Sequence, residues 1–312
     1  MTTMINVDGL VKDFGLIKAV DNVTFTVDRG EVLGFLGPNG AGKSTTMKMI
    51  TGFLTPTAGR VSVCGHDVVD RPIQAKAQIG YLPEGAPAYA DMTPRGFLKF
   101  IAEIRGFSGA EAQRCIGAAV AKVQLREVMD QSIDTLSKGF KRRVGLAQAL
   151  IHDPEVLFLD EPTEGLDPNQ KHEVRALIGE MSQDKAIIIS THILEQVDAV
   201  CTRALIIARG RIVADGTPDQ LESRSELHNA VSITTTADGA ADALTGLPGV
   251  RRVERVGDNV YRVYPQDGQS VIAEVSAHAR EKGWPVDQLI VENGRLDEVF
   301  RRITATGESE AA

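Results

Sequence analysis

The chain has 312 residues, of which 43% are hydrophobic and 24% charged, and its 34 basic and 42 acidic side chains give a formal net charge of -8. This length allows about two domains, and the composition is typical of a globular protein that buries a full core. The acidic balance argues against a protein that coats nucleic acid, because phosphate binding favours a basic surface.

Signals for membrane insertion and secretion are also missing from the sequence. No uncharged stretch approaches the roughly 20 residues that a membrane-spanning helix needs. The first residues, MTTMINVDGL, do not combine a basic region with an apolar one, so we expect no secretory signal. The three cysteines (Cys64, Cys115 and Cys201) lie far apart and predict reduced thiols in a cytosolic compartment, with no disulfide frame and no zinc site.

Three short apolar runs predict buried parallel strands, because both faces of each run are hydrophobic. The runs are Val32–Leu36, Val156–Leu159 and Ala186–Ile189. They are followed by a glycine-rich loop, by Asp160-Glu161 and by Ser190-Thr191-His192, respectively. Ligands of open α/β sheets bind beyond the carboxyl ends of the strands, so three separate stretches point to one crevice.

The glycine-rich loop, Gly37–Ser44, fits the pattern G-x-x-x-x-G-K-[ST] between the first strand and a helix-like run, Ser44–Ile50. Glycines let backbone N–H groups converge on an anion, and the helix N-terminus adds partial positive charge. Lys43 can reach the β- and γ-phosphates, and the Ser44 hydroxyl can bind Mg²⁺. A glycine-rich turn can match this pattern by chance, but the strand, loop and helix context favours a phosphate site.

The region 92–152 is rich in helical patterns. Apolar side chains recur at helical spacing from Phe140 to Ile151, and Asp153-Pro154 ends this helix.

The acidic pair after the second strand is a candidate for metal binding and catalysis. Asp160 could hold Mg²⁺ while Glu161 orients and activates a water, although an isolated acidic pair is more often a cap or turn. His192 alone would be a capped or core side chain, and beside a phosphate site it becomes a candidate γ-phosphate contact.

A boundary is expected in the polar linker 219–229. After it, strand-like runs at Val231–Thr236, Val250–Val256, Val260–Tyr264 and Val286–Val291 alternate with helical runs at Asp238–Thr245, Ser270–Lys282 and Leu296–Ile303. The order β-α-β-β-α-β predicts a small ferredoxin-like α+β domain over 230–303. We expect residues 304–312 to form a flexible tail.

Together these motifs resemble the ATP-binding cassette of ABC transporters, and the resemblance covers residues 1–218. The matching segments are Phe14 (adenine stacking), Gly37–Thr45 (Walker A), Leu136–Phe140 (signature), Val156–Asp160 (Walker B), Gly165–Asp167 (D-loop) and His192 (switch). The implied fold is an α/β P-loop NTPase cassette with a helical subdomain, and the implied cofactors are ATP and Mg²⁺.

The resemblance also implies roles for individual residues. The implied ATP contacts are Phe14, Gly37, Pro38, Asn39, Gly40, Ala41, Gly42, Lys43, Ser44, Thr45, Ser137, Gly139 and Asp167. The implied catalytic residues are Lys43, Glu161 and His192, and the implied Mg²⁺ ligands are Ser44, Glu84 and Asp160. In this family two cassettes pack head to tail, so Ser137 and the Gly139 amide would meet the γ-phosphate of the partner.

The ending Arg295–Phe300 is similar to bacterial export-type ATPases, which implies separate membrane-spanning permease subunits and a peripheral position on the cytoplasmic face of the inner membrane. We expect a homodimer and no nucleic-acid partner. The expected docking surface is Gly85–Met92 and the helix after it, although its apolar side chains could equally belong to the core. Those side chains are Tyr89, Met92, Phe97 and Phe100.

Three positions depart from the family pattern. Glu84 replaces the glutamine of the Q-loop and adds negative charge near the phosphates, although a carboxylate can still bind Mg²⁺ and the export-type branch admits this variant. In the signature, Lys138 replaces a glycine and either adds charge at the trans site or faces solvent, and Phe140 replaces a glutamine. The run Lys141–Arg143 predicts a solvated helix face more than a phosphate clamp.

Two other function classes are disfavoured by the sequence. A soluble ABC ATPase acting on nucleic acid or the ribosome is disfavoured by net acidity, by the single cassette and by the short distance from Ser44 to Ser137, which leaves no room for a long coiled coil. A non-catalytic nucleotide sensor is disfavoured by the presence of both Glu161 and His192. For the C-terminal domain we expect a packing platform, because it contains no cluster of catalytic or metal-binding residue types.

Overall fold

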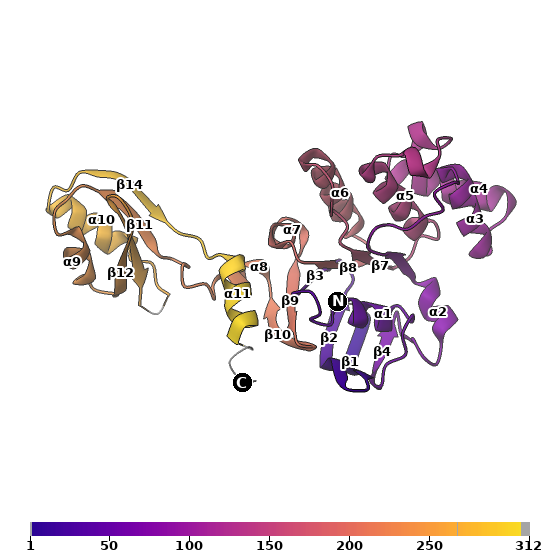
Figure 1. Ribbon diagram of the computed structural model, residues 1–312, viewed down its shortest axis with the longest axis horizontal. Coiled ribbons are helices and arrows are strands. Elements are labelled where there is room, and N and C mark those ends of the chain that lie inside the picture. Colours follow the sequence, from indigo (N-terminus) through magenta and orange to yellow (C-terminus); the bar gives the residue numbers. More distant parts are fainter. Residues whose placement is uncertain (1, 267, 307–312) are drawn as a thin grey trace. The chain divides into compact units, whose positions relative to one another are not determined.

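The structure is a computed structural model that describes residues 2–266 and 268–306. The chain divides into two compact units, Met1–Thr217 and Pro218–Ala312, and each is described by itself (Figure 1). Within the described residues no helix is both long enough and apolar enough to cross a bilayer.

The first unit is built on a six-stranded sheet with the order β10-β9-β3-β8-β7-β6. Its strands are β3 (Val32–Leu36), β6 (Ile79–Leu82), β7 (Val156–Asp160), β8 (Ala186–Thr191), β9 (Arg203–Ala208) and β10 (Arg211–Gly216). The three apolar runs of the sequence form the adjacent strands β3, β8 and β7, which are parallel and buried throughout. The prediction of buried parallel strands is therefore confirmed.

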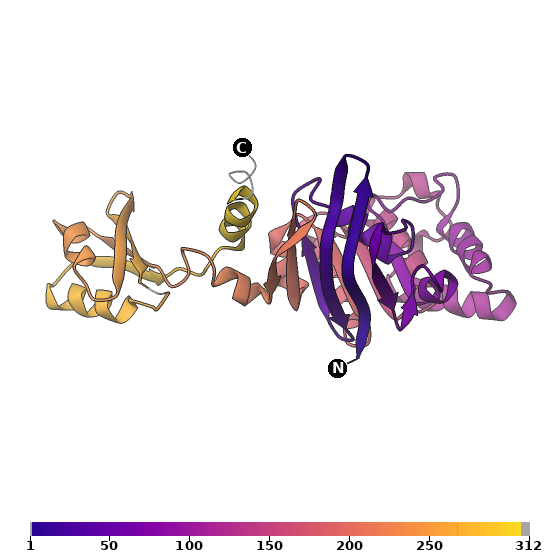
Figure 2. The same cartoon turned by 90° about the horizontal axis from the view of Figure 1, so that it is seen from below.

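A second, antiparallel sheet packs against this one. Its order is β2-β1-β4-β5, and Figure 2 shows β1 and β2 as two long neighbouring strands. The strands are β1 (Thr3–Phe14), β2 (Ile17–Asp28), β4 (Ala58–Val63) and β5 (His66–Asp67). Alternate side chains of β2 are buried, and the rings of Phe25 on β2 and Phe35 on β3 lie 5.8 Å apart between the sheets. One continuous apolar core thus joins both sheets.

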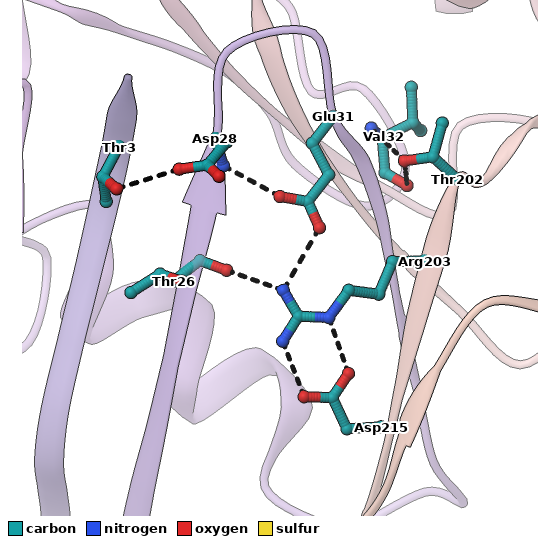
Figure 3. Close-up of polar contacts among 8 residues, drawn as sticks. All are labelled: Thr3, Thr26, Asp28, Glu31, Val32, Thr202, Arg203 and Asp215. Carbon is teal, nitrogen blue, oxygen red and sulfur yellow. Dashed lines mark hydrogen bonds and ion pairs between the residues drawn. The ribbon is translucent and has the colours of Figure 1, made fainter. Parts of the chain in front are cut away.

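A polar network centred on Arg203 fixes the edge of this two-sheet assembly (Figure 3). Its Nε and Nη2 donate to the two oxygens of Asp215, each at 2.6 Å. Its Nη1 donates to the Thr26 carbonyl at 3.1 Å and to Glu31 Oε1 at 3.2 Å, and Glu31 Oε2 accepts from the Asp28 amide at 2.8 Å. The hydrogen bond to Asp215 raises the pKa of the Arg203 guanidinium, so one permanent cation links β9 and β10 to the end of β2.

Helices cover and extend the six-stranded sheet. They are α1 (Lys43–Ile50), α2 (Pro72–Ala77), α3 (Pro94–Ile104), α4 (Gly109–Lys122), η1 (Arg126–Val128), η2 (Ile133–Thr135), α5 (Lys138–Leu150), α6 (Pro168–Met181) and α7 (Leu194–Val200). In Figure 1, α3, α4 and α5 gather together, in agreement with the helix-rich region expected at 92–152. The backbone leaves α5 through Asp153, which has a φ of 47° and precedes Pro154.

The second unit contains an antiparallel sheet with the order β12-β13-β11-β14. Its elements are α8 (Pro218–Glu222), β11 (Val231–Thr235), α9 (Ala240–Thr245), β12 (Val250–Gly257), β13 (Val260–Pro265), α10 (Ile272–Glu281), β14 (Val286–Val291) and α11 (Leu296–Thr306). The expected order β-α-β-β-α-β is confirmed, and the strand order is that of a ferredoxin-like fold. Its core includes Val231, Val263 and Val275.

Two details of this unit differ from the sequence-based expectation. The stretch 219–229 was expected to be linker, but it begins within α8, whose Leu221 is fully buried and supplies the packing that a linker lacks. The helix expected to end at Ile303 continues to Thr306. The remaining part of the expected tail, 307–312, lies outside the described residues.

Candidate functional site

The carboxyl ends of β3, β7 and β8 meet at one edge of the six-stranded sheet. Leu36 is paired with Thr191, and Asp160 is paired with Ser190. The glycine-rich loop, the acidic pair and His192 each follow one of these strands directly. The three stretches that the sequence assigns to one site therefore follow strands that end at the same edge of the sheet.

The glycine-rich loop is closely packed on one side and open on the other. Gly42 has a φ of 107°, and a Cβ there would lie 2.5 Å from the Ala19 carbonyl oxygen. Gly40 has a φ of 79°, and a Cβ there would have no neighbouring atom within 4 Å. Only glycine fits at Gly42, at the N-terminus of α1, where the helix dipole favours an anion. This backbone cradle fits a polyphosphate.

Lys43 is the first residue of α1 and is only 8% exposed. Its Nζ donates to the Gly37 carbonyl at 2.6 Å and to the Pro38 carbonyl at 3.2 Å, so it spans the loop. Burial lowers the pKa of Lys43, and the nearby carboxylates Glu161, Asp160 and Glu84 counteract this shift. The ammonium group therefore contacts the loop carbonyls, and its charge interacts favourably with these carboxylates.

Glu161 occupies a strained backbone position and is held by three donors. Its φ is 46°, in the left-handed region that side chains rarely adopt, and the residue is 7% exposed. Oε1 lies 2.7 Å from His192 Nδ1 and accepts from the His192 amide at 3.0 Å. Oε2 accepts from the Thr191 hydroxyl at 3.1 Å. The sequence indicated Glu161 and His192, but not Thr191, whose only signal is its place before His192 at a buried strand end.

Asp160, one residue earlier, is 6% exposed at the end of β7. Burial raises the pKa of its carboxyl, the Ser190 hydroxyl lowers it, and Glu161 raises it. Tyr81 on β6 has a pKa raised to about 12, first by burial and then by Asp160 and Glu84. The carboxylates of Asp160 and Glu84 therefore both raise the pKa of the same hydroxyl, that of Tyr81.

The oxygen atoms at this edge fit Mg²⁺. The Ser44 hydroxyl is exposed, and Asp160 and Glu84 carry carboxylates. Across the described part of the chain, no three His, Cys, Asp or Glu side chains gather as a complete metal site. Mg²⁺ does not need a complete set of protein ligands, because it usually combines one or two carboxylates with water and substrate phosphates. The donor set suits a metal that arrives with a nucleotide.

The signature segment forms the start of α5. Ser137 is exposed and caps the helix, where its Oγ accepts from the Phe140 amide at 3.3 Å. Gly139 is buried, and a Cβ there would lie 2.7 Å from the Gln170 side chain. Asp167 caps α6, and its Oδ1 accepts from the Gln170 amide at 2.9 Å. The signature and the D-loop thus form one surface.

No hydrogen bond among the described residues joins this surface to the glycine-rich loop of the same chain. Among the described residues, neither Ser137 nor Gly139 hydrogen-bonds to the residues of that loop. Lys138, exposed at the signature, lies alongside Gly165 of the D-loop. Phe14 is 53% exposed at the end of β1, with Lys12 Nζ 5.2 Å from its ring centre. The first unit therefore carries an exposed aromatic ring at Phe14, together with the glycine-rich loop and the signature surface, which share no hydrogen bond in the described part of the chain.

The basic run in α5 differs from the expectation of a solvated face. Lys141 donates to the Asp134 carbonyl at 2.9 Å, and Arg143 pairs with Glu173. Arg142, however, is only 5% exposed, so the prediction is wrong for this residue. The reason is helical periodicity, because Arg142 lies on the face of α5 that packs against the sheet.

The aromatic residues near α3 divide between surface and core. Tyr89 is 55% exposed, whereas Phe97 is 5% exposed. The Tyr89 ring lies 6.2 Å from that of Phe97 and 5.7 Å from that of Phe100. Met92 and Phe100 are half-buried. Tyr89 is thus the exposed member of a small aromatic cluster.

Known proteins are similar to this chain in sequence and in structure. The family model described as ABC transporter matches residues 20–164. The Nod factor export ATP-binding protein I of Paraburkholderia xenovorans is 34% identical over 301 residues, which cover 96% of this chain and 96% of that protein. The probable multidrug ABC transporter ATP-binding protein YbhF of Escherichia coli is 38% identical over 224 residues, which cover 72% of this chain.

The aligned part spans only 39% of the length of YbhF. A solved structure described as the ATP binding subunit of an ABC transporter superposes with a TM-score of 0.64 and 33% identity, covering 70% of this chain and 92% of that chain.

Proposed function

Because this chain belongs to the ATP-binding proteins of the ABC transporter family, we propose that it is the ATP-hydrolysing subunit of an exporter. In this proposal it works as a head-to-tail homodimer that drives separate membrane-spanning permease subunits from the cytoplasmic face of the inner membrane. The relative from Paraburkholderia xenovorans is named for export, which supports the direction of transport. Both this relative and YbhF are named as export or transporter proteins, which does not favour the rival function, an ATPase acting on nucleic acid or the ribosome.

The observation that carries the proposal is the position of Glu161. Its carboxylate is buried, oriented by His192 and Thr191, and placed one residue after Asp160 at the edge that holds the glycine-rich loop. A carboxylate held by fixed donors is suited to orient a water and take its proton. The neighbouring cradle is suited to hold the triphosphate that this water attacks.

In the proposed reaction, the adenine stacks on Phe14 and the phosphates bind the amides of Gly37–Thr45. Lys43 exchanges its contacts with the loop carbonyls for the β- and γ-phosphates. Glu161 accepts a proton from the attacking water, while His192 holds the Glu161 carboxylate and contacts the γ-phosphate. Ser44, Asp160 and Glu84 are the residues that would hold Mg²⁺, which neutralises phosphate charge when it is bound.

The second copy supplies the remaining part of the site. Ser137 uses its Oγ as an acceptor for the Phe140 amide, so its hydroxyl proton remains available for a phosphate oxygen. It also lies at a helix N-terminus, where the dipole favours an anion. Since Ser137 does not reach the loop of its own chain, we place it, with the Gly139 amide and Asp167, on the ATP of the partner.

Complementation between two inactive variants tests this arrangement. Lys43→Ala and Ser137→Ala each remove one half of both sites in a homodimer, so each variant alone is expected to lose Mg²⁺-dependent ATP hydrolysis. A mixture contains heterodimers with one intact site, and we expect it to regain activity. No recovery on mixing would overturn the trans arrangement, and an inactive wild-type chain that binds no Mg²⁺-ATP would overturn the proposed function.

A further inference from the structure

Lys12 lies near the end of β1 and takes no part in the proposed reaction. Its half-buried side chain reaches the Thr55 carbonyl, to which Nζ donates at 2.8 Å. The same ammonium group lies over the Phe14 ring, 5.2 Å from the ring centre. Residues two positions apart in a strand point to the same side, which brings these two side chains together. Because the hydrogen bond to Thr55 fixes the ammonium, its contact with the ring has a defined geometry.

The Phe14 ring has little apolar packing to hold it. It is 53% exposed, and among the described residues it does not belong to the core of the first unit. Phe14 is paired with Ile17 across the end of the β1–β2 hairpin, where Ile17 and Leu16 are also exposed. An aromatic side chain at such a tip is not fixed by burial, so the contact with Lys12 is what restrains it.

The loop Thr55–Thr57 holds the end of β1 at three successive positions. The Thr57 amide donates to the Val11 carbonyl at 2.8 Å, and the Thr57 hydroxyl accepts from the Asp13 amide at 3.0 Å. The contact with Lys12 lies between these two. The chain reaches this loop from α1, the helix at whose N-terminus the glycine-rich loop ends. The segment that forms the phosphate cradle therefore also fixes the cation beside the aromatic ring.

A cation is attracted to the face of an aromatic ring when it lies within about 6 Å of the ring centre, which the Lys12 ammonium does. A ring has two faces, and Lys12 occupies one of them. The opposite face remains for a planar base. A ring that is already restrained loses less conformational freedom when the base stacks on it, so this arrangement favours binding.

We propose that Lys12 is a positioning residue for the base of the nucleotide: its ammonium holds the Phe14 ring from one face, so that the base stacks on the other. Lys12 acts through Phe14 and contacts neither the base nor the phosphates. The loop Thr55–Thr57 sets the position of this platform relative to the glycine-rich loop. The inference rests on the proposed ATP site for its effect on binding, but the contact between Lys12 and Phe14 exists without nucleotide.

The first test compares a ligand that has a base with one that has none. Equilibrium binding to the full chain is measured for a non-hydrolysable ATP analogue and for inorganic tripolyphosphate, each with Mg²⁺. Lys12→Met keeps the alkyl chain and removes the charge. We expect K12M to raise the dissociation constant of the analogue about fivefold and to leave that of tripolyphosphate within about twofold. An equal loss for both ligands, or no loss for the analogue, overturns the proposal.

Two further variants test whether the effect passes through the ring. K12R keeps a cation and is expected to bind the analogue within about twofold of the wild type. In an F14L background, which lacks the ring, K12M is expected to add less than a further twofold loss. A K12R variant as weak as K12M, or a full fivefold loss without the ring, contradicts a role through Phe14.

Lys18→Met is the matched control. Lys18 is 50% exposed on β2 of the same hairpin, and its Nζ lies 3.5 Å from Asp21 Oδ1. K18M removes the same charge, so a general electrostatic effect on a polyphosphate would appear in both variants. We expect K18M to bind both ligands within about twofold of the wild type. If K18M weakened analogue binding as much as K12M, the assignment to Lys12 would fail.

Thermal unfolding of the nucleotide-free full chain tests the contact independently of the proposed function. K12M is expected to lower the melting temperature about 2 °C more in the wild-type background than in the F14L background. Equal shifts would refute the contact between Lys12 and Phe14. A wild-type chain that binds neither ligand refutes the proposed ATP site and the effect on base binding, whereas the unfolding cycle still decides the contact.

Discussion

His192 Nδ1 lies 2.7 Å from Glu161 Oε1, and the His192 backbone amide donates to the same oxygen at 3.0 Å. One residue therefore fixes one carboxylate oxygen twice, through its ring and through its main chain. The other oxygen accepts from Thr191, so the carboxylate is held at both ends. Such a group can act on a water without first reorganising.

The first prediction concerns the Glu161 carboxylate itself. Glu161→Gln keeps the side-chain shape and removes the proton acceptor, so turnover of Mg²⁺-ATP is expected to fall at least about 10²-fold. ATP should still bind, and the chain should elute as a nucleotide-stabilised dimer in size-exclusion chromatography. Glu155→Gln is the control, because Glu155 precedes the same strand and pairs with Arg29 at the surface. Wild-type turnover in E161Q would rule out the assigned role.

The second prediction concerns the hydroxyl of Thr191. Thr191→Val removes the donor to Glu161 Oε2, and we expect kcat to fall about tenfold while ATP affinity stays near that of the wild type. Thr202→Val is the matched control, since its hydroxyl bonds to the Val32 backbone at 3.0 Å on another part of the sheet. The control is expected to lower stability without a selective loss of kcat. Equal kcat values for the two variants would contradict a role of Thr191 in holding Glu161.

The third prediction separates steric fit from backbone strain in the glycine-rich loop. Gly42→Ala places a Cβ 2.5 Å from the Ala19 carbonyl oxygen at a φ of 107° and is expected to abolish Mg²⁺-ATP binding. Gly106→Ala imposes a similar positive φ of 88° where no atom lies within 4 Å. It should cost only about 1 kcal/mol of stability and leave binding intact. Isothermal titration with ATP distinguishes these outcomes, and normal binding by G42A would refute the cradle.

The fourth prediction is a pH dependence of stability. Burial lowers the pKa of His152 from 6.5 to about 4, and its buried Nδ1 has no hydrogen-bond partner within the described residues. Above pH 6.5, the pKa of His152 in the unfolded chain, the residue is neutral in both states and the free energy of unfolding is not reduced by its titration. As the pH falls from 6.5 toward 4, the unfolded chain takes up a proton that the folded chain excludes, so stability falls.

Urea unfolding can measure this loss. Between pH 7 and pH 5 the contribution of His152 amounts to about 2 kcal/mol. His152→Gln keeps a donor for the Ile79 carbonyl, which His152 Nε2 contacts at 2.9 Å, but it cannot titrate. The variant should therefore lose about 2 kcal/mol less than the wild type over this range. Identical pH profiles would show that His152 is not the group responsible.

Local patterns were sufficient for much of the fold and of the site. The strand at Val32–Leu36 has the predicted bounds, because a run of apolar side chains and its flanking turns determine a strand locally. The last strand, Val286–Val291, also has the predicted bounds, although it includes Asp287 and Gln288. Gly42 and Lys43 could be assigned from their spacing alone, since the loop needs glycine at a fixed distance from the helix start. The function followed from the order of several such motifs.

The contacts of Arg142, Thr191 and Leu221 depend instead on residues far away in the chain. The basic run of α5 predicts a solvated face, but α5 packs on Leu82 and Ala86, and Arg142 on this helix is buried. The polar stretch 219–229 predicts a linker, but in the structure it begins within α8, whose Leu221 is fully buried. The sequence alone determined which chemical groups this protein carries and in which order. Only the tertiary structure decided which groups are buried and which charges face one another, because burial and electrostatic pairing are properties of surfaces that form when distant segments pack.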